Sequence, residues 1–127
     1  MSWTLFHERT AFMVDLIERA GHDPETALDF DTAERAEVQR LFGDDDTLVL
    51  ALRQRWMTTL AAKLDQAAHD DVSSEQARAE LAAAQPGLRA LLDVAARRSV
   101  RLRALDRAEQ RIIDYYNGPG PQRQTVA

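Results

Sequence analysis

The sequence predicts an all-α protein, arranged as an antiparallel helical bundle of four main helices plus one short helix. Apolar residues recur at every third or fourth position in each long segment, which is helical spacing, and no segment alternates polar and apolar residues as a strand does. Residues typical of helix ends bound these segments. The 127 residues are 45% hydrophobic and 29% charged, as in one ordinary globular domain. We therefore expect a single helical-bundle domain over residues 1–117 and a disordered tail over residues 118–127.

The first helix is expected to run from Ser2 to Ala20 and to end at Gly21, a residue that readily adopts the left-handed conformation found just beyond helix ends. Its apolar positions are Trp3, Leu5, Phe6, Phe12, Met13, Val14, Leu16, Ile17 and Ala20. They cover more than half of the helix circumference, which is wider than the ~100° stripe of a helix with one neighbour. This helix should therefore lie between two neighbours.

Two further helices are predicted before residue 70. Asp31 and Glu34 have the spacing of a capping box and open a short helix that ends at Gly43. Three aspartates then precede a longer helix from about Thr47 to Ala68, where carboxylates favour a helix N-terminus. The inward face of this helix is predicted to be Val49, Leu52, Trp56, Leu60, Leu64 and Ala67.

The C-terminal part is predicted to hold an alanine-rich helix and then one long helix. Ser73 or Ser74 caps the alanine-rich helix, and Gln85-Pro86 marks a kink or a restart because proline suits a first helical turn. The long helix is expected from Pro86 to Tyr116, a length of ~46 Å at 1.5 Å per residue. It should overhang the bundle at one end, where Ile112, Ile113, Tyr115 and Tyr116 would form an apolar dimer surface.

No motif for catalysis, a metal or a cofactor is found. The three histidines lack the spacing of a di-iron helical bundle, the three consecutive aspartates lack that of a calcium loop, and the five glycines form no phosphate loop. There is no cysteine and no run of ~18 apolar residues that could span a membrane. The sequence therefore predicts a cytoplasmic protein that is not an enzyme and needs no cofactor. Its many alanines and arginines, with one lysine, are typical of a GC-rich bacterial genome.

Four charged residues fall on faces that are otherwise apolar. Arg53 and Lys63 lie within the apolar arc of the third helix, and Arg98 and Glu109 interrupt the apolar seam of the last. Charges in such positions are costly unless they are paired. We expect either a structural ion pair or arginine stems that reach water, with a pocket for a small polar ligand around Arg53, Lys63 and Glu109 as the functional alternative.

A broad basic face is predicted along the last helix, opposite its apolar seam. Its members are Arg89, Arg97, Arg101, Arg103, Arg107 and Arg111. Such a face can bind nucleic acid, an anionic membrane surface or an acidic protein, or can simply be solvated. The net charge of −5 repels phosphate at long range and disfavours nucleic acid.

The residues taken together favour a non-enzymatic interaction or regulatory module that binds a protein partner or a second copy of itself, as a homodimer through the long helix. One alternative is a nucleic-acid-associated protein that uses the arginine face. The other is a helical bundle that senses a small polar ligand.

Overall fold

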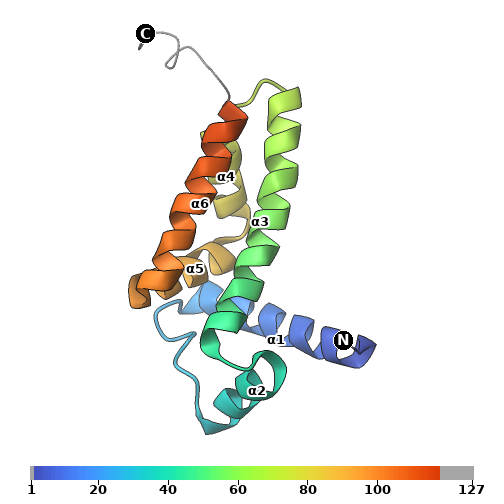
Figure 1. Ribbon diagram of the computed structural model, residues 1–127, viewed down its shortest axis with the longest axis vertical. Helices are drawn as coiled ribbons and strands as arrows, with labels where there is room; N and C mark the ends of the chain where they lie inside the picture. The colour runs from blue at the N-terminus through green and yellow to red at the C-terminus, as the bar shows by residue number, and fades with distance from the viewer. Residues whose placement is uncertain (1, 118–127) are drawn as a thin grey trace.

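A computed structural model describes residues 2–117, which form six helices and no strand (Figure 1). The helices are α1 (Trp3–His22), α2 (Thr32–Phe42), α3 (Asp45–His69), α4 (Ser74–Ala84), α5 (Pro86–Arg98) and α6 (Val100–Asn117). The prediction of an all-helical protein is confirmed. The predicted disordered tail, residues 118–127, lies outside the described residues.

Side-chain caps account for where the first three helices begin, and those of the second and third helices were predicted. The side chain of Ser2 accepts a hydrogen bond from the backbone N–H of Leu5, and Asp31 forms the full capping box with Glu34. Asp44 accepts a bond of 2.7 Å from the backbone N–H of Thr47, and its hydrogen bonds with Thr47 hold the pKa of this carboxyl below its ordinary value. Local sequence therefore fixes these helix starts.

The predicted long helix over residues 86–116 is wrong, because the chain breaks at Ser99. This residue has extended backbone angles, φ −141° and ψ 126°, and its hydroxyl accepts a 3.3 Å hydrogen bond from the backbone N–H of Leu102. Serine competes with helical geometry in this way because its side chain can satisfy a free backbone N–H. The break separates α5 from α6, so that the two helices contact each other instead of forming one rod.

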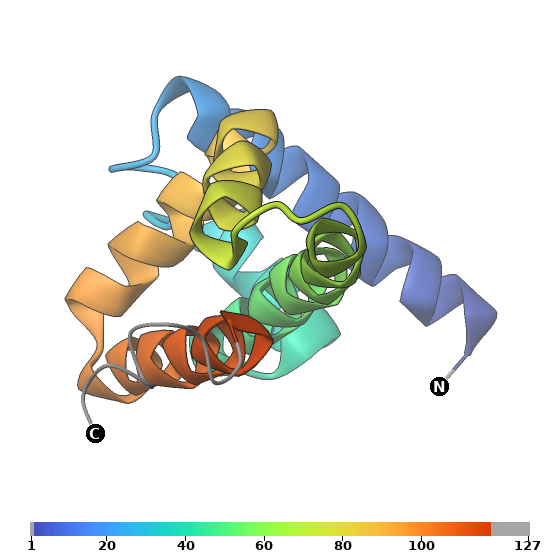
Figure 2. The same ribbon diagram turned by 90° about the horizontal axis from the view of Figure 1, so that it is seen from above.

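The helices α3, α4 and α6 lie side by side, and α3 and α6 are parallel (Figures 1 and 2). Later residues of α3 contact later residues of α6, as in a parallel pair. The contacts are Arg53 with Asp106, Trp56 with Glu109, and Asp65 with Tyr116. The helix α4 runs the other way, since Glu75 meets Asn117 and Arg78 meets Glu109. The helices α1 and α2 lie across the end of this group at which α3 begins (Figure 1). The predicted antiparallel four-helix arrangement is therefore not confirmed.

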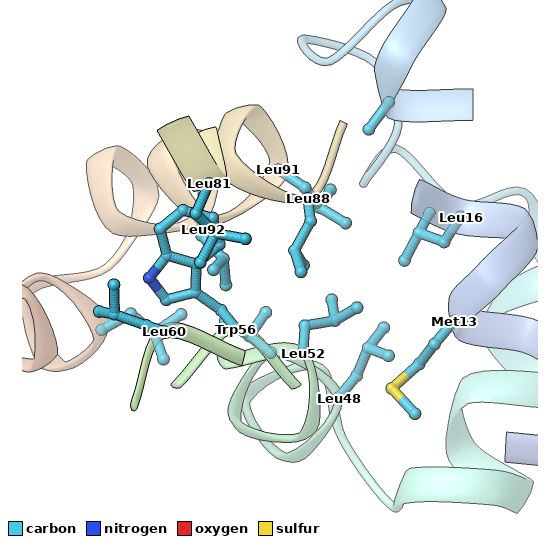
Figure 3. Close-up of a cluster of buried hydrophobic side chains, with 14 of the residues drawn as sticks. Met13, Leu16, Leu48, Leu52, Trp56, Leu60, Leu81, Leu88, Leu91 and Leu92 are labelled. Carbon is cyan, nitrogen blue, oxygen red and sulfur yellow. The ribbon is translucent and has the colours of Figure 1, made fainter. Parts of the chain in front are cut away.

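The apolar core is centred on the face of α3 that was predicted to point inward. Trp56, Leu52 and Leu60 are completely buried, and the other three predicted positions are also buried. Figure 3 shows this face between side chains of α1, such as Leu16, and side chains of α5, such as Leu91. The core thus joins helices that are far apart in the sequence.

The contact between α1 and α5 depends on one glycine. A Cβ atom on Gly87 would lie 2.3 Å from the carbonyl oxygen of Ile17, so only glycine allows the two backbones to approach this closely. This contact holds the C-terminal half of α1. The N-terminal end of α1 projects past α3, away from the other helices (Figure 2).

Candidate functional site

A buried charged cluster lies where α3, α4, α5 and α6 meet, and Glu109 of α6 is its centre. The Glu109 side chain is only 3% exposed. Its Oε1 atom accepts hydrogen bonds from Arg53 Nη1 at 3.1 Å, Trp56 Nε1 at 3.0 Å and Arg89 Nη1 at 3.3 Å. Its Oε2 atom accepts one from Arg78 Nε at 2.5 Å. Both carboxylate oxygens are thus used by donors from three other helices.

Two more carboxylates complete the cluster. Asp106 accepts a hydrogen bond from Arg53 at 2.9 Å, and Asp93 accepts two from Arg89, at 2.7 and 3.1 Å. The guanidinium of Arg89 also lies 4.7 Å from the centre of the Trp56 ring, within the range of a cation–π interaction. Three arginines therefore meet three carboxylates, and the formal charges cancel.

A half-open cleft of about 400 Å³ lies above this cluster. Its lining includes the two arginines Arg78 and Arg89 and the carboxylates Asp93, Asp106 and Glu109. Each of these guanidinium groups already donates to a carboxylate of the protein itself. The cluster is therefore electrostatically complete without a ligand, which indicates a structural role.

The four charged residues predicted to share a cluster are divided between three places. Arg53 and Glu109 do meet. Lys63 instead lies 3.5 Å from Glu80 in a half-exposed ion pair. Arg98 is at the surface, where it donates to Asp29 at 3.0 Å. Lys63 is therefore paired outside the cluster that contains Arg53 and Glu109.

Four members of the cluster were not predicted from the sequence: Arg78, Arg89, Asp93 and Asp106. Two spacings signal three of them, Arg89, Asp93 and Asp106, in retrospect. Arg89 and Asp93 are one helical turn apart, as are Asp106 and Glu109, so each pair lies on one helix face.

The arginines of the predicted basic face are divided between two helices. The break at Ser99 places Arg89 and Arg97 on α5 and the other four arginines on α6. Arg89 is buried in the charged cluster, which removes it from the surface. Arg107 and Arg111 remain exposed on α6.

Other arginines of this predicted face bind the acidic N-terminal half of the same chain. Arg97 donates to Glu25 at 2.6 Å, and Arg101 lies 3.1 Å from Asp46. Residues 1–72 hold 15 acidic and 7 basic side chains, whereas residues 73–127 hold 6 and 9. Intramolecular ion pairs thus partly neutralise this uneven distribution of charge. Fewer arginines are left for an acidic partner than the sequence alone suggests.

The predicted apolar dimer surface at the end of α6 is also reduced. Ile113 lies in the core, and the Tyr116 hydroxyl donates to Asp65 at 2.5 Å, which raises the pKa of Tyr116. Only Ile112 and Tyr115 stay exposed. The reason is the parallel pairing of α3 and α6, which turns Ile113 and Tyr116 towards α3 and α4.

An aromatic patch, formed by Trp3 and Phe6, lies on the projecting N-terminal end of α1. The side chains are 74% and 50% exposed, and their rings stack with centres 5.8 Å apart. Val14 is exposed two turns further along the same helix face. We expected α1 to lie between two neighbours. It does contact two other helices, α5 and α2. Its face with Met13 and Leu16 is covered, whereas among the described residues the face that carries the aromatic patch is not.

A groove of about 540 Å³ adjoins the patch, between α1 and α3. Its lining residues are Phe6, Gln54, Arg55, Thr58, Thr59 and Gln85. We call it the α1–α3 groove. It was not predicted, because the approach of α1 to α3 depends on tertiary packing. The only sequence signal was the excess of apolar positions around α1.

The part of the chain from residue 2 to residue 117 contains no group of three or more histidine, aspartate or glutamate side chains that could hold a metal ion. None of its helices is both long and apolar enough to cross a membrane.

Comparison of the chain with models of protein families, with curated proteins and with solved structures finds no match.

Proposed function

We propose that this protein is a non-enzymatic interaction module that binds a protein partner through the aromatic patch on α1. The observation that carries the proposal is the exposure of Trp3 and Phe6 on a helix whose other face is anchored in the core. Large aromatic side chains dominate the energy of protein interfaces, and tryptophan is among the residues enriched there. A rigid helix presents them at little cost in entropy.

The charges support this proposal over its two alternatives. The charged cluster is already neutral, so none of its charged side chains lacks a counter-ion that a small polar ligand could supply. The arginines of the predicted basic face are divided between two helices and partly bound to Glu25 and Asp46. Nucleic-acid binding needs a concentrated basic patch to overcome a net charge of −5. We therefore place the interaction on α1, in a protein that we take to be bacterial and cytoplasmic.

Site-specific photo-crosslinking in the native cell tests the proposal. Phe6 is replaced in the full chain by benzoylphenylalanine, and crosslinked products are identified by mass spectrometry. We expect a discrete protein adduct, which disappears when Trp3→Ser is added because the patch is then incomplete. An adduct of twice the mass of the chain identifies the partner as a second copy.

The matched control carries the same crosslinker at Arg107, which is exposed on α6. We expect no adduct from this position. An adduct from position 107 alone, whether with protein or nucleic acid, would overturn the proposal in favour of the arginine surface. The absence of any adduct from position 6 would equally contradict it.

A further inference from the structure

The α1–α3 groove has one charged lining residue, and that residue is unpaired. Arg55 makes no ion pair with any residue in the range 2–117. Arg53, by contrast, pairs with two carboxylates inside the protein. The guanidinium of Arg55 is therefore available to a ligand.

Some of the uncharged polar groups of the groove already form hydrogen bonds within the protein, and others do not. Gln54 donates to the Thr58 hydroxyl at 3.1 Å, and the Thr59 hydroxyl donates to the Arg55 carbonyl oxygen at 3.1 Å. Gln85 lies at the junction of α4 and α5, and its side chain makes no capping hydrogen bond. Among these residues, Arg55 and Gln85 have side chains that make no hydrogen bond within residues 2–117, and Phe6 lines the same groove.

We infer that the α1–α3 groove binds a partner segment that presents an apolar, preferably aromatic, side chain beside a carboxylate. The ring packs on Phe6, and the carboxylate pairs with Arg55. This inference rests on the proposed function and names the chemistry of the partner. A volume of about 540 Å³ lies within the ~300–1,000 Å³ of typical ligand pockets, so one ring and one carboxylate fit.

The charge of Arg55 and the aromatic wall formed by Phe6 favour a partner segment with a carboxylate beside an apolar side chain. A guanidinium forms its strongest pairs with carboxylate or phosphate. Phosphate sites usually gather several donors around one anion, whereas this groove offers a single cation beside an aromatic ring. A carboxylate attached to an apolar group uses both features.

The test is a titration of the ¹⁵N-labelled full chain, followed by NMR, with two matched probes. N-acetylphenylalanine carries the ring and the carboxylate, and N-acetylphenylalaninamide carries the same ring without the charge. For so small a ligand we expect a dissociation constant on the order of 1 mM. The amide should bind about three- to five-fold more weakly, the size of one exposed ion pair. Shifts should centre on Phe6, Arg55 and Thr58.

Two variants test whether Arg55 causes the preference for the acid over the amide. Arg55→Gln should abolish the preference for the acid, and Arg107→Gln, also an exposed arginine, should leave it unchanged. Circular dichroism verifies that both variants are folded. A third probe, inorganic phosphate at the same concentrations, distinguishes a general anion site from the proposed one, because it should shift these signals less than the acid does.

Equal binding of the two phenylalanine probes overturns the inference, as does a preference that survives Arg55→Gln. The inference is also overturned if the chemical-shift changes lie outside the groove, or if phosphate binds as tightly as the acid. It is overturned too if neither probe causes a shift at 20 mM, well above the expected dissociation constant of ~1 mM. If this inference fails while the crosslink from position 6 persists, the partner uses the aromatic patch without Arg55, and the proposed function stands. Loss of both overturns both.

Discussion

Arg53 and Arg55 are two residues apart on α3 and lie in opposite environments. Arg53 is buried and paired with Asp106 and Glu109, whereas Arg55 lines the α1–α3 groove without an ion pair to any described residue. Two residues correspond to a rotation of ~200° around a helix, so the two side chains point to opposite sides. The comparison teaches that on one side of α3, which we call the closed side, the charges are paired within the protein and stabilise the fold. The other side, which we call the open side, leaves the Arg55 cation without a counter-ion among residues 2–117.

The closed side should be the more sensitive to mutation. Glu109→Ala removes the acceptor shared by Arg53, Arg78 and Arg89, and it leaves arginines buried without their counter-ion. Breaking a buried ion pair by removing one partner costs about 3 to 5 kcal/mol. We expect a loss of free energy of unfolding in this range, measured by urea denaturation.

The control for this prediction is Glu80→Ala, which breaks the half-exposed pair with Lys63. Exposed pairs contribute ~0–1 kcal/mol, so the loss should be small. If Glu109→Ala cost no more than Glu80→Ala, the charged cluster would not hold the fold together. The cleft above it would then become the better candidate for a binding site.

The next largest loss of stability is expected when the contact between α1 and α5 is disrupted, since α1 forms one wall of the α1–α3 groove. Gly87→Ala would place a Cβ atom 2.3 Å from the Ile17 carbonyl oxygen, so α1 must move away from α5. Overpacking of this kind typically costs about 1 to 3 kcal/mol. Gly21→Ala is the matched control, because a Cβ atom there meets nothing within 4 Å.

We expect thermal melting of Gly87→Ala well below that of the wild type and of Gly21→Ala. The Phe6 and Arg55 amide signals should also shift in the NMR spectrum of Gly87→Ala, because α1 forms one wall of the groove. Equal melting temperatures for the two variants would show that α1 is not held by this contact.

The smallest effect tests the parallel pairing of α3 and α6. The hydrogen bond from Tyr116 to Asp65 raises the pKa of Tyr116 above its ordinary value of about 10. Because the folded pKa is the raised one, this bond contributes fully below about pH 10, and its contribution is lost as the pH rises through the folded pKa. Absorbance at 295 nm in Tyr115→Phe isolates Tyr116. Adding Asp65→Asn should lower its pKa towards 10, and an unchanged titration would contradict the pairing.

The elements that could be predicted from the sequence are those set by local chemistry. The capping box at Asp31 and the aspartate cap before α3 were read directly, because each acts within three or four residues. The buried face of α3, with Trp56, followed from a regular apolar period. Arg53 and Glu109 were predicted to share a buried polar cluster, because a charge on an apolar face must be paired.

The features that were missed depend on the path of the chain between helices. The break at Ser99 was hidden because the apolar seam continues through it with helical spacing. The break places Arg97 and Arg101 on different helices. The α1–α3 groove likewise requires knowledge of the close contact at Gly87, which no periodic pattern indicates.

The most direct test of the closed and open sides of α3 is the free energy of unfolding of two matched variants, Arg53→Gln and Arg55→Gln. Arg53→Gln leaves Asp106 without its 2.9 Å partner and Glu109 with fewer donors, so we predict a loss of at least about 2 kcal/mol. Arg55→Gln should change stability by less than about 0.5 kcal/mol, as surface substitutions do. Equal losses for the two variants, or a larger loss for Arg55→Gln, would contradict the account.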